Sequence, residues 1–83
     1  MRWARTVYSM TTTSAATVGH NIRAEMTLQA FSQTQVAKVL GLSQSGVSRR
    51  LLGDIAFDVV ELTTLANLFG VSASYLLGES AKA

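Results

Sequence analysis

Four polar residues with hydrogen-bonding side chains lie within six consecutive positions: Gln44, Ser45, Ser48 and Arg49. Glutamine can pair bidentately with adenine, arginine with guanine, and serine with either kind of base edge. On a helix, a rotation of about 100° per residue turns the two serines and Arg49 away from the face that carries Val47 and Leu51. Gln44 falls in the first turn. The spacing therefore predicts one helix face that carries these four side chains, which either are solvated or reach base edges if the helix enters a major groove.

Further residues are candidates for contacts with DNA phosphates. The candidates are Gln33, Arg50, Lys38 and Arg23, with Arg2 and Arg5 as a possible N-terminal arm that follows a groove. Gln33 opens a predicted helix, where free amides and the positive end of the helix dipole favour an anion. Arg50 lies on the flank of the base-reading segment, where a phosphate contact is expected.

The distribution of charge agrees with a polyanionic partner. The 83 residues carry a net charge of +2, but residues 1–50 hold six basic side chains against one acid, and residues 51–83 hold one basic side chain against four acids. A basic half beside an acidic half favours a face that meets nucleic acid.

Several other classes of function find no support in the composition. The chain has no cysteine and a single histidine, His20, so neither a disulfide framework nor a metal cluster is expected. No pair of carboxylates and no nucleophile with a neighbouring base suggests an enzyme, and no cofactor is implied. No apolar run approaches the roughly 20 residues of a membrane span, and a cytoplasmic location is expected.

The elements that must position these residues are predicted to be five short helices. The first is expected from about Thr17 to Gln29, because Val18, Ile22 and Met26 recur every four residues. The later helices have N-caps at Ser32, Ser43, Asp58 and Ser72 and end at Gly41, Gly53, Gly70 and Gly78. Serine and aspartate are favoured N-caps, and glycine readily takes the left-handed conformation that ends a helix.

The fold class is therefore all-α, a compact five-helix domain. The domain is expected over residues 14–78, with a flexible tail at 1–13 and another at 79–83. The expected core contains Met26, Phe31, Val36, Ala37, Leu40, Val47, Leu51, Leu62, Leu65, Ala66 and Phe69. In the loop between the third and fourth helices, Ile55 and Phe57 are both expected to plug this core.

Only Gly41, Leu42 and Ser43 separate the second and third helices. A turn this short forces the two axes to cross steeply, as in helix-turn-helix units. Ala37 is small where the two helices approach each other, and Leu42 and Val47 supply apolar contacts that fix the angle.

From Ile22 to Leu77 the sequence resembles the phage repressor and Cro-type helix-turn-helix family, the XRE-like or lambda-repressor-like domains. The matching residues are Ser32-Gln33, Val36-Ala37, Leu40 to Ser45, Val47 to Arg49, Gly53, Leu65-Ala66 and Leu68 to Ser72. The resemblance implies a third helix that enters the major groove of double-stranded DNA, and a homodimer that binds a near-palindromic operator and represses transcription. The chain departs from the family at Arg50 and Leu51, so the tilt of the third helix rests on Val47 and Leu51.

Two other functions use the same fold. The domain can be the antitoxin of a toxin–antitoxin pair, or a protein-interaction module in which exposed Leu52 and the last helix contact a partner. Tyr75 and Leu77, on that last helix, are candidates for a dimer contact.

Overall fold

The computed structural model describes residues 14–79, and this part of the chain forms five helices and no strand. The helices are α2 (Ala15–Gln29), α3 (Gln33–Leu40), α4 (Gln44–Leu52), α5 (Val59–Phe69) and α6 (Ala73–Leu77). The prediction of an all-α fold with five helices is confirmed.

All five helices of residues 14–79 begin with a side-chain N-cap and end at a residue in the left-handed conformation. The N-caps are Ser14, Ser32, Ser43, Asp58 and Ser72, and in each case the side chain accepts a hydrogen bond from a backbone amide three residues later. The left-handed residues that end the helices are Ala30, Gly41, Gly53, Gly70 and Gly78. At each end the amide that follows the left-handed residue donates to a carbonyl five residues back, as in a Schellman motif.

The predicted start of the first helix was two residues late. Ser14 accepts a hydrogen bond from the amide of Thr17 at 3.1 Å, so the first turn lies before Thr17 rather than after it. At its other end, the helix closes on Ala30, which has a φ of 62°. A left-handed alanine costs about 1–2 kcal/mol because its Cβ crowds the following carbonyl oxygen.

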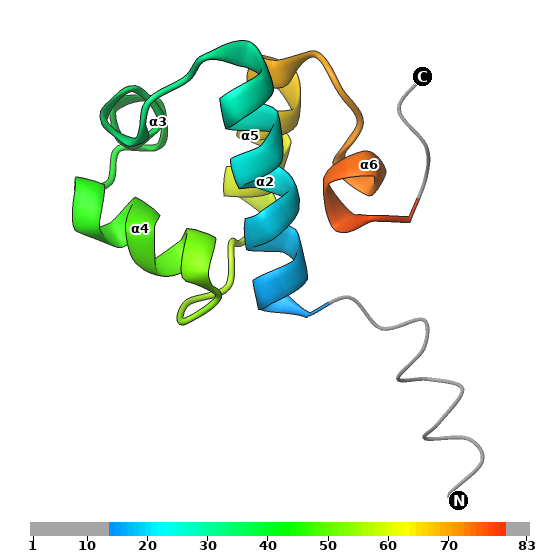
Figure 1. Ribbon diagram of the computed structural model, residues 1–83, viewed down its shortest axis with the longest axis horizontal. Helices are drawn as coiled ribbons and strands as arrows, with labels where there is room; N and C mark the ends of the chain where they lie inside the picture. The colour runs from blue at the N-terminus through cyan, green and yellow to red at the C-terminus, as the bar shows by residue number, and fades with distance from the viewer. Residues whose placement is uncertain (1–13, 80–83) are drawn as a thin grey trace, which may run out of the picture.

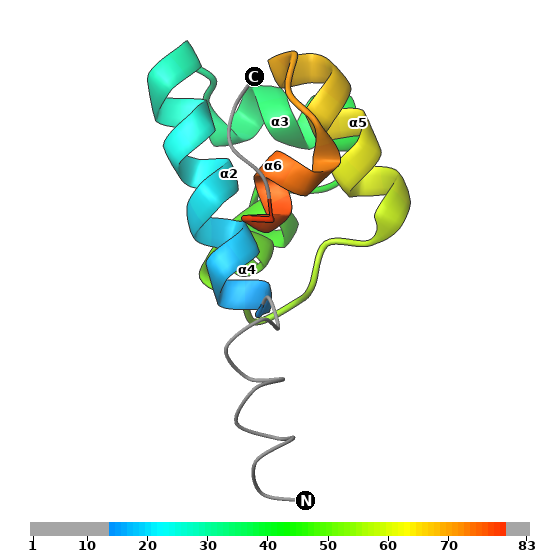
Figure 2. The same ribbon diagram turned by 90° about the vertical axis from the view of Figure 1, so that its right-hand side faces the viewer.

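The helices enclose one core (Figure 1). α2 runs through the middle of the molecule, with α4 beside one end of it and α5 behind it. Figure 2 shows α6 between α2 and α5, and it contacts both. The buried side chains are Val18, Ile22, Met26, Val36, Ala37, Val47, Leu51, Phe57, Leu65, Ala66, Phe69 and Leu76. Phe31, Leu40 and Leu62 pack against them while partly exposed.

The prediction that both apolar side chains of the loop between α4 and α5 plug the core is wrong for one of them. Phe57 is buried, but Ile55 is 38% exposed and does not belong to the core. Burial of the larger aromatic ring removes more apolar surface from water.

Candidate nucleic-acid interface

The caps at both ends of the connecting turn position α3 and α4. Ser32 and Gln35 form a capping box at the start of α3, in which the Gln35 amide donates to Ser32 Oγ and the Ser32 amide donates to Gln35 Oε1. Gly41, with a φ of 68°, ends α3, and Ser43 caps α4 by accepting from the Gly46 amide at 3.0 Å. Figure 1 looks along the axis of α3 while α4 lies across the view, so the two axes cross steeply as the short turn predicts.

Two glycines let α2 approach the last turn of α4 closely. A Cβ at Gly19 would lie 2.3 Å from the carbonyl oxygen of Leu51 and 2.8 Å from that of Arg50. A Cβ at Gly53 would lie 2.7 Å from Cα of Ala16. Because both neighbours are backbone atoms, only glycine fits at either site. This contact, together with buried Val47 and Leu51, sets how α4 lies on the domain.

The residues predicted to read bases share the outer face of α4. Gln44, Ser45 and Arg49 are exposed, and Ser48 is half-buried at the edge of this face. Leu52 lies one turn beyond Arg49 on the same side and is 59% exposed. The face therefore offers amide, hydroxyl and guanidinium groups for hydrogen bonds, with an apolar side chain at its C-terminal end.

The residues predicted to contact phosphate do not all have the same surroundings. Lys38 and Arg23 are exposed, and Gln33 is half-buried at the first position of α3. Arg23 borders a shallow concavity on α2 together with His20, Ala24, Thr27 and Leu28. Arg2 and Arg5 lie outside the described residues.

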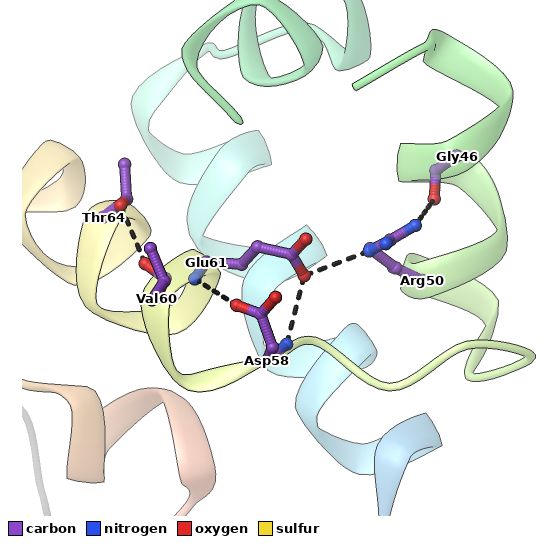
Figure 3. A network of polar contacts seen from close by, with 6 residues as sticks. All are labelled: Gly46, Arg50, Asp58, Val60, Glu61 and Thr64. Carbon is purple, nitrogen blue, oxygen red and sulfur yellow. Dashed lines mark hydrogen bonds and ion pairs between the residues drawn. The ribbon is translucent and has the colours of Figure 1, made fainter. Parts of the chain in front are cut away.

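Arg50 is already bound within the domain. Its Nε donates to Glu61 Oε1 at 3.1 Å, and its Nη1 donates to the carbonyl of Gly46 at 3.0 Å (Figure 3). The predicted phosphate contact of Arg50 is left untested by this pairing. A weak signal of the pairing with Glu61 was present in the sequence, as an acid in the first turn of the next helix.

The sequence reasoning missed a buried carboxylate. Glu25, on α2, is 2% exposed. The Tyr75 hydroxyl donates to Glu25 Oε1 at 3.2 Å, and the Gln29 side-chain amide donates to its other oxygen. Gln29 also donates to the carbonyl of Phe69 at 2.9 Å. These bonds tie α2 to the segments on either side of Gly70.

The two residues predicted to form a dimer contact, Tyr75 and Leu77, are both partly buried and pack against the core. The tyrosine hydroxyl is used inside the domain, so less of this side chain is available to a second chain than the sequence suggested. The dimer contact itself stays a prediction.

Among residues 14–79, no group of three or more histidine, cysteine, aspartate or glutamate side chains is placed to hold a metal ion. None of the helices in this range is both long and apolar enough to cross a membrane.

Comparison with known proteins adds a family and a relative. Residues 13–83 match the BetR domain. Over 59 residues, 71% of the chain, the sequence is 32% identical to the SPbeta prophage-derived uncharacterized HTH-type transcriptional regulator YonR of Bacillus subtilis (strain 168). The matched region spans 55% of that relative, so the chain covers about half of its length.

Proposed function

This chain belongs to the BetR domain family, and on that premise we propose that it is a sequence-specific DNA-binding regulator of transcription. The observation that carries the proposal is the outer face of α4. Gln44, Ser45 and Arg49 stand exposed on a helix that two caps and a close backbone contact hold against the domain. The name of the relative from Bacillus subtilis, a transcriptional regulator of helix-turn-helix type, supports the same function.

In this proposal α4 lies in the major groove and contacts base edges. Arg49 would pair with guanine and Gln44 with adenine, while Ser45 and Ser48 would contact either kind of base. Gln33, Lys38 and Arg23 would contact phosphates, and Arg2 and Arg5 would form an arm along a groove. Phosphate contacts set the register of the protein on DNA, and base contacts set its sequence preference.

We further propose a phage-type repressor or Cro-like protein that acts in the cytoplasm. The prophage origin in the relative's name supports this narrower class. The chain would bind a near-palindromic operator as a homodimer, because a two-fold symmetric protein matches two half-sites that are related by the same symmetry. An antitoxin that regulates its own operon uses the same surface and stays the alternative.

A protein-interaction role is a second candidate, and one observation favours it. Three apolar side chains near the loop between α4 and α5 are more than half exposed: Leu52 at 59%, Val59 at 77% and Val60 at 73%. Exposed apolar side chains often mark a contact with another protein where they form a contiguous patch. A purified chain that binds a protein but never shifts DNA mobility would favour this candidate.

The direct test is selection of bound sites from random double-stranded DNA, followed by an anisotropy titration of the selected site. We expect affinity to fall steeply with salt as counterions are released from the phosphates. Arg49→Ala should cost about 1–3 kcal/mol on the selected site and relax the preference at one base pair. Lys38→Ala is the matched control, since it removes one positive charge and should weaken binding to all sequences alike. Equal, weak binding of the unmodified chain to every sequence would contradict the proposal.

A further inference from the structure

The side chains of Arg50 and Glu61 form a bridge between α4 and the first turn of α5 (Figure 3). The pair has 16% and 12% of its side-chain surface exposed, so solvent ions screen it less than a surface pair. The arginine has two fixed partners, Glu61 through Nε and the carbonyl of Gly46 through Nη1. Such a forked contact depends on the planar guanidinium, which a lysine cannot imitate.

The bridge crosses a gap between the two backbones. Along their full lengths, no Cα atom of α4 lies within 8 Å of one in α5, whereas α4 contacts both α2 and α3. The glycine contact with α2 holds the last turn of α4, and the short turn from α3 holds its first turn. On the side that faces α5, the Arg50–Glu61 pair supplies a polar link.

Glu61 is also held in place by hydrogen bonds that do not involve Arg50. Its Oε1 accepts from the Asp58 amide at 3.1 Å, and its own amide donates to Asp58 Oδ1 at 2.7 Å. This capping box fixes the carboxylate at the start of α5. Arg50 therefore binds a preorganised carboxylate. Its bond to the Gly46 carbonyl, one turn back, lays the Arg50 side chain along one side of α4.

We propose that Arg50 is a positioning residue for DNA recognition, which acts through Glu61 to hold the orientation of α4 and thereby of Arg49. The inference rests on the proposed function and gives Arg50 a role other than a phosphate contact. Arg49 and Arg50 are adjacent in sequence, yet one is exposed on the outer face and the other is bonded toward α5. A rotation of α4 would carry the outer side chains away from the base edges.

The test compares four substitutions in the full chain, of which Arg50→Met removes the charge at position 50. Arg50→Lys keeps the positive charge and the ability to contact phosphate, but it loses the forked contact. Glu61→Gln keeps an oxygen for the Asp58 amide, because glutamine also serves in a capping box, and it removes the charge that faces Arg50. Asp58→Asn is the matched control, since it raises the net charge by the same amount beside the same site and keeps the N-cap.

Binding to the selected DNA site should separate the two roles of Arg50. We expect Arg50→Lys and Glu61→Gln each to weaken binding about tenfold, and the double variant to be no weaker than either single one. The dependence of affinity on salt should stay unchanged, and Asp58→Asn should bind within about twofold of the unmodified chain. If instead Arg50→Lys binds normally while Arg50→Met lowers the salt slope by about 0.9, Arg50 contacts a phosphate and the proposal is overturned.

A measurement without DNA distinguishes a failure of this proposal from a failure of the proposed function. Backbone NMR resonances of α4 should move in the same way in Arg50→Lys and Glu61→Gln and stay unchanged in Asp58→Asn. Unmoved α4 resonances in both bridge variants would show that the pair does not position the helix, whatever the DNA titration gives. A chain that selects no DNA sequence refutes the proposed function, and with it the recognition role of Arg50. Circular dichroism of each variant confirms that folded protein is compared.

Discussion

Replacing Gly19 with alanine would place a methyl group inside the closest contact between α2 and α4. The new Cβ would lie 2.3 Å from the carbonyl oxygen of Leu51, whereas ordinary van der Waals contact begins at 3.4 Å. The two helices must therefore separate by about 1 Å at this point, because neither backbone can rotate away as a side chain would.

The expected loss of stability follows from two opposing terms. Inserting a carbon atom into a packed contact costs about 1–3 kcal/mol, and the backbone neighbours of Gly19 place this case near the upper end. Alanine returns about 1 kcal/mol because it favours the helix more than glycine does. The net loss should be about 2 kcal/mol, which lowers the melting temperature of a domain of this size by about 8–16 °C.

Urea denaturation at 25 °C gives the change in the free energy of unfolding, and the DNA titration gives the change in affinity of the folded protein. We expect the affinity of Gly19→Ala for the selected site to fall at a temperature where the variant is fully folded, since α4 shifts on the domain. Gly46→Ala is a control for stability, because the nearest neighbour of its new Cβ is a side-chain atom, the Ser43 hydroxyl oxygen at 3.2 Å, rather than a backbone atom of another helix at 2.3 Å. If Gly19→Ala is as stable as the unmodified chain, the close packing of α2 on α4 is refuted.

Three further substitutions test other contacts of the described domain. Gly53→Ala should cost roughly 1–3 kcal/mol more than Gly41→Ala in urea denaturation. Both residues have a positive φ, 88° and 68°, but only a Cβ at 53 meets the backbone of α2, so equal losses would argue against that contact. Ala30→Gly should raise the free energy of unfolding by about 1 kcal/mol in a thermal melt, since it relieves the left-handed alanine, and an unchanged melting temperature would contradict this. Tyr75→Phe should lower stability by about 1 kcal/mol because buried Glu25 loses a donor. A Tyr75→Phe variant with unchanged unfolding would show that the remaining contacts of the carboxylate suffice.

The ends of the helices were predictable because the groups that make them are neighbours in sequence. Ser32 and Asp58 are N-caps as predicted, and Gln35 and Glu61, each three residues later, complete a capping box with them. Gly41 closes its helix with bonds to carbonyls only three to five residues back. The face of α4 also followed from sequence, since buried Val47 and Leu51 determine which side chains point outward.

The sequence-based prediction failed at the start of α2 and at one of the two apolar residues in the loop between α4 and α5. The start of α2 was expected near Thr17, but Ser14 is the N-cap, since its side-chain oxygen accepts from the Thr17 amide. Ile55 and Phe57 are both apolar residues in one loop, and only Phe57 is buried. For the loop residues, burial in the core selects between two apolar candidates that a sequence pattern does not separate.

Relations between distant residues were decided only by the tertiary structure. The position of α4 depends on Gly19 against Leu51, a contact that no periodicity of apolar residues reveals, because it consists of the absence of a side chain where two backbones meet. The same holds for the partly buried hydrogen bond between Glu25 and Tyr75, 50 residues apart. The sequence by itself determined where the last four helices begin, where all five end and which face each buries, since hydrogen bonds between near neighbours and apolar spacing control these features. How the helices approach one another, and therefore how the base-reading face is held, depends on shapes and charges that meet only after folding.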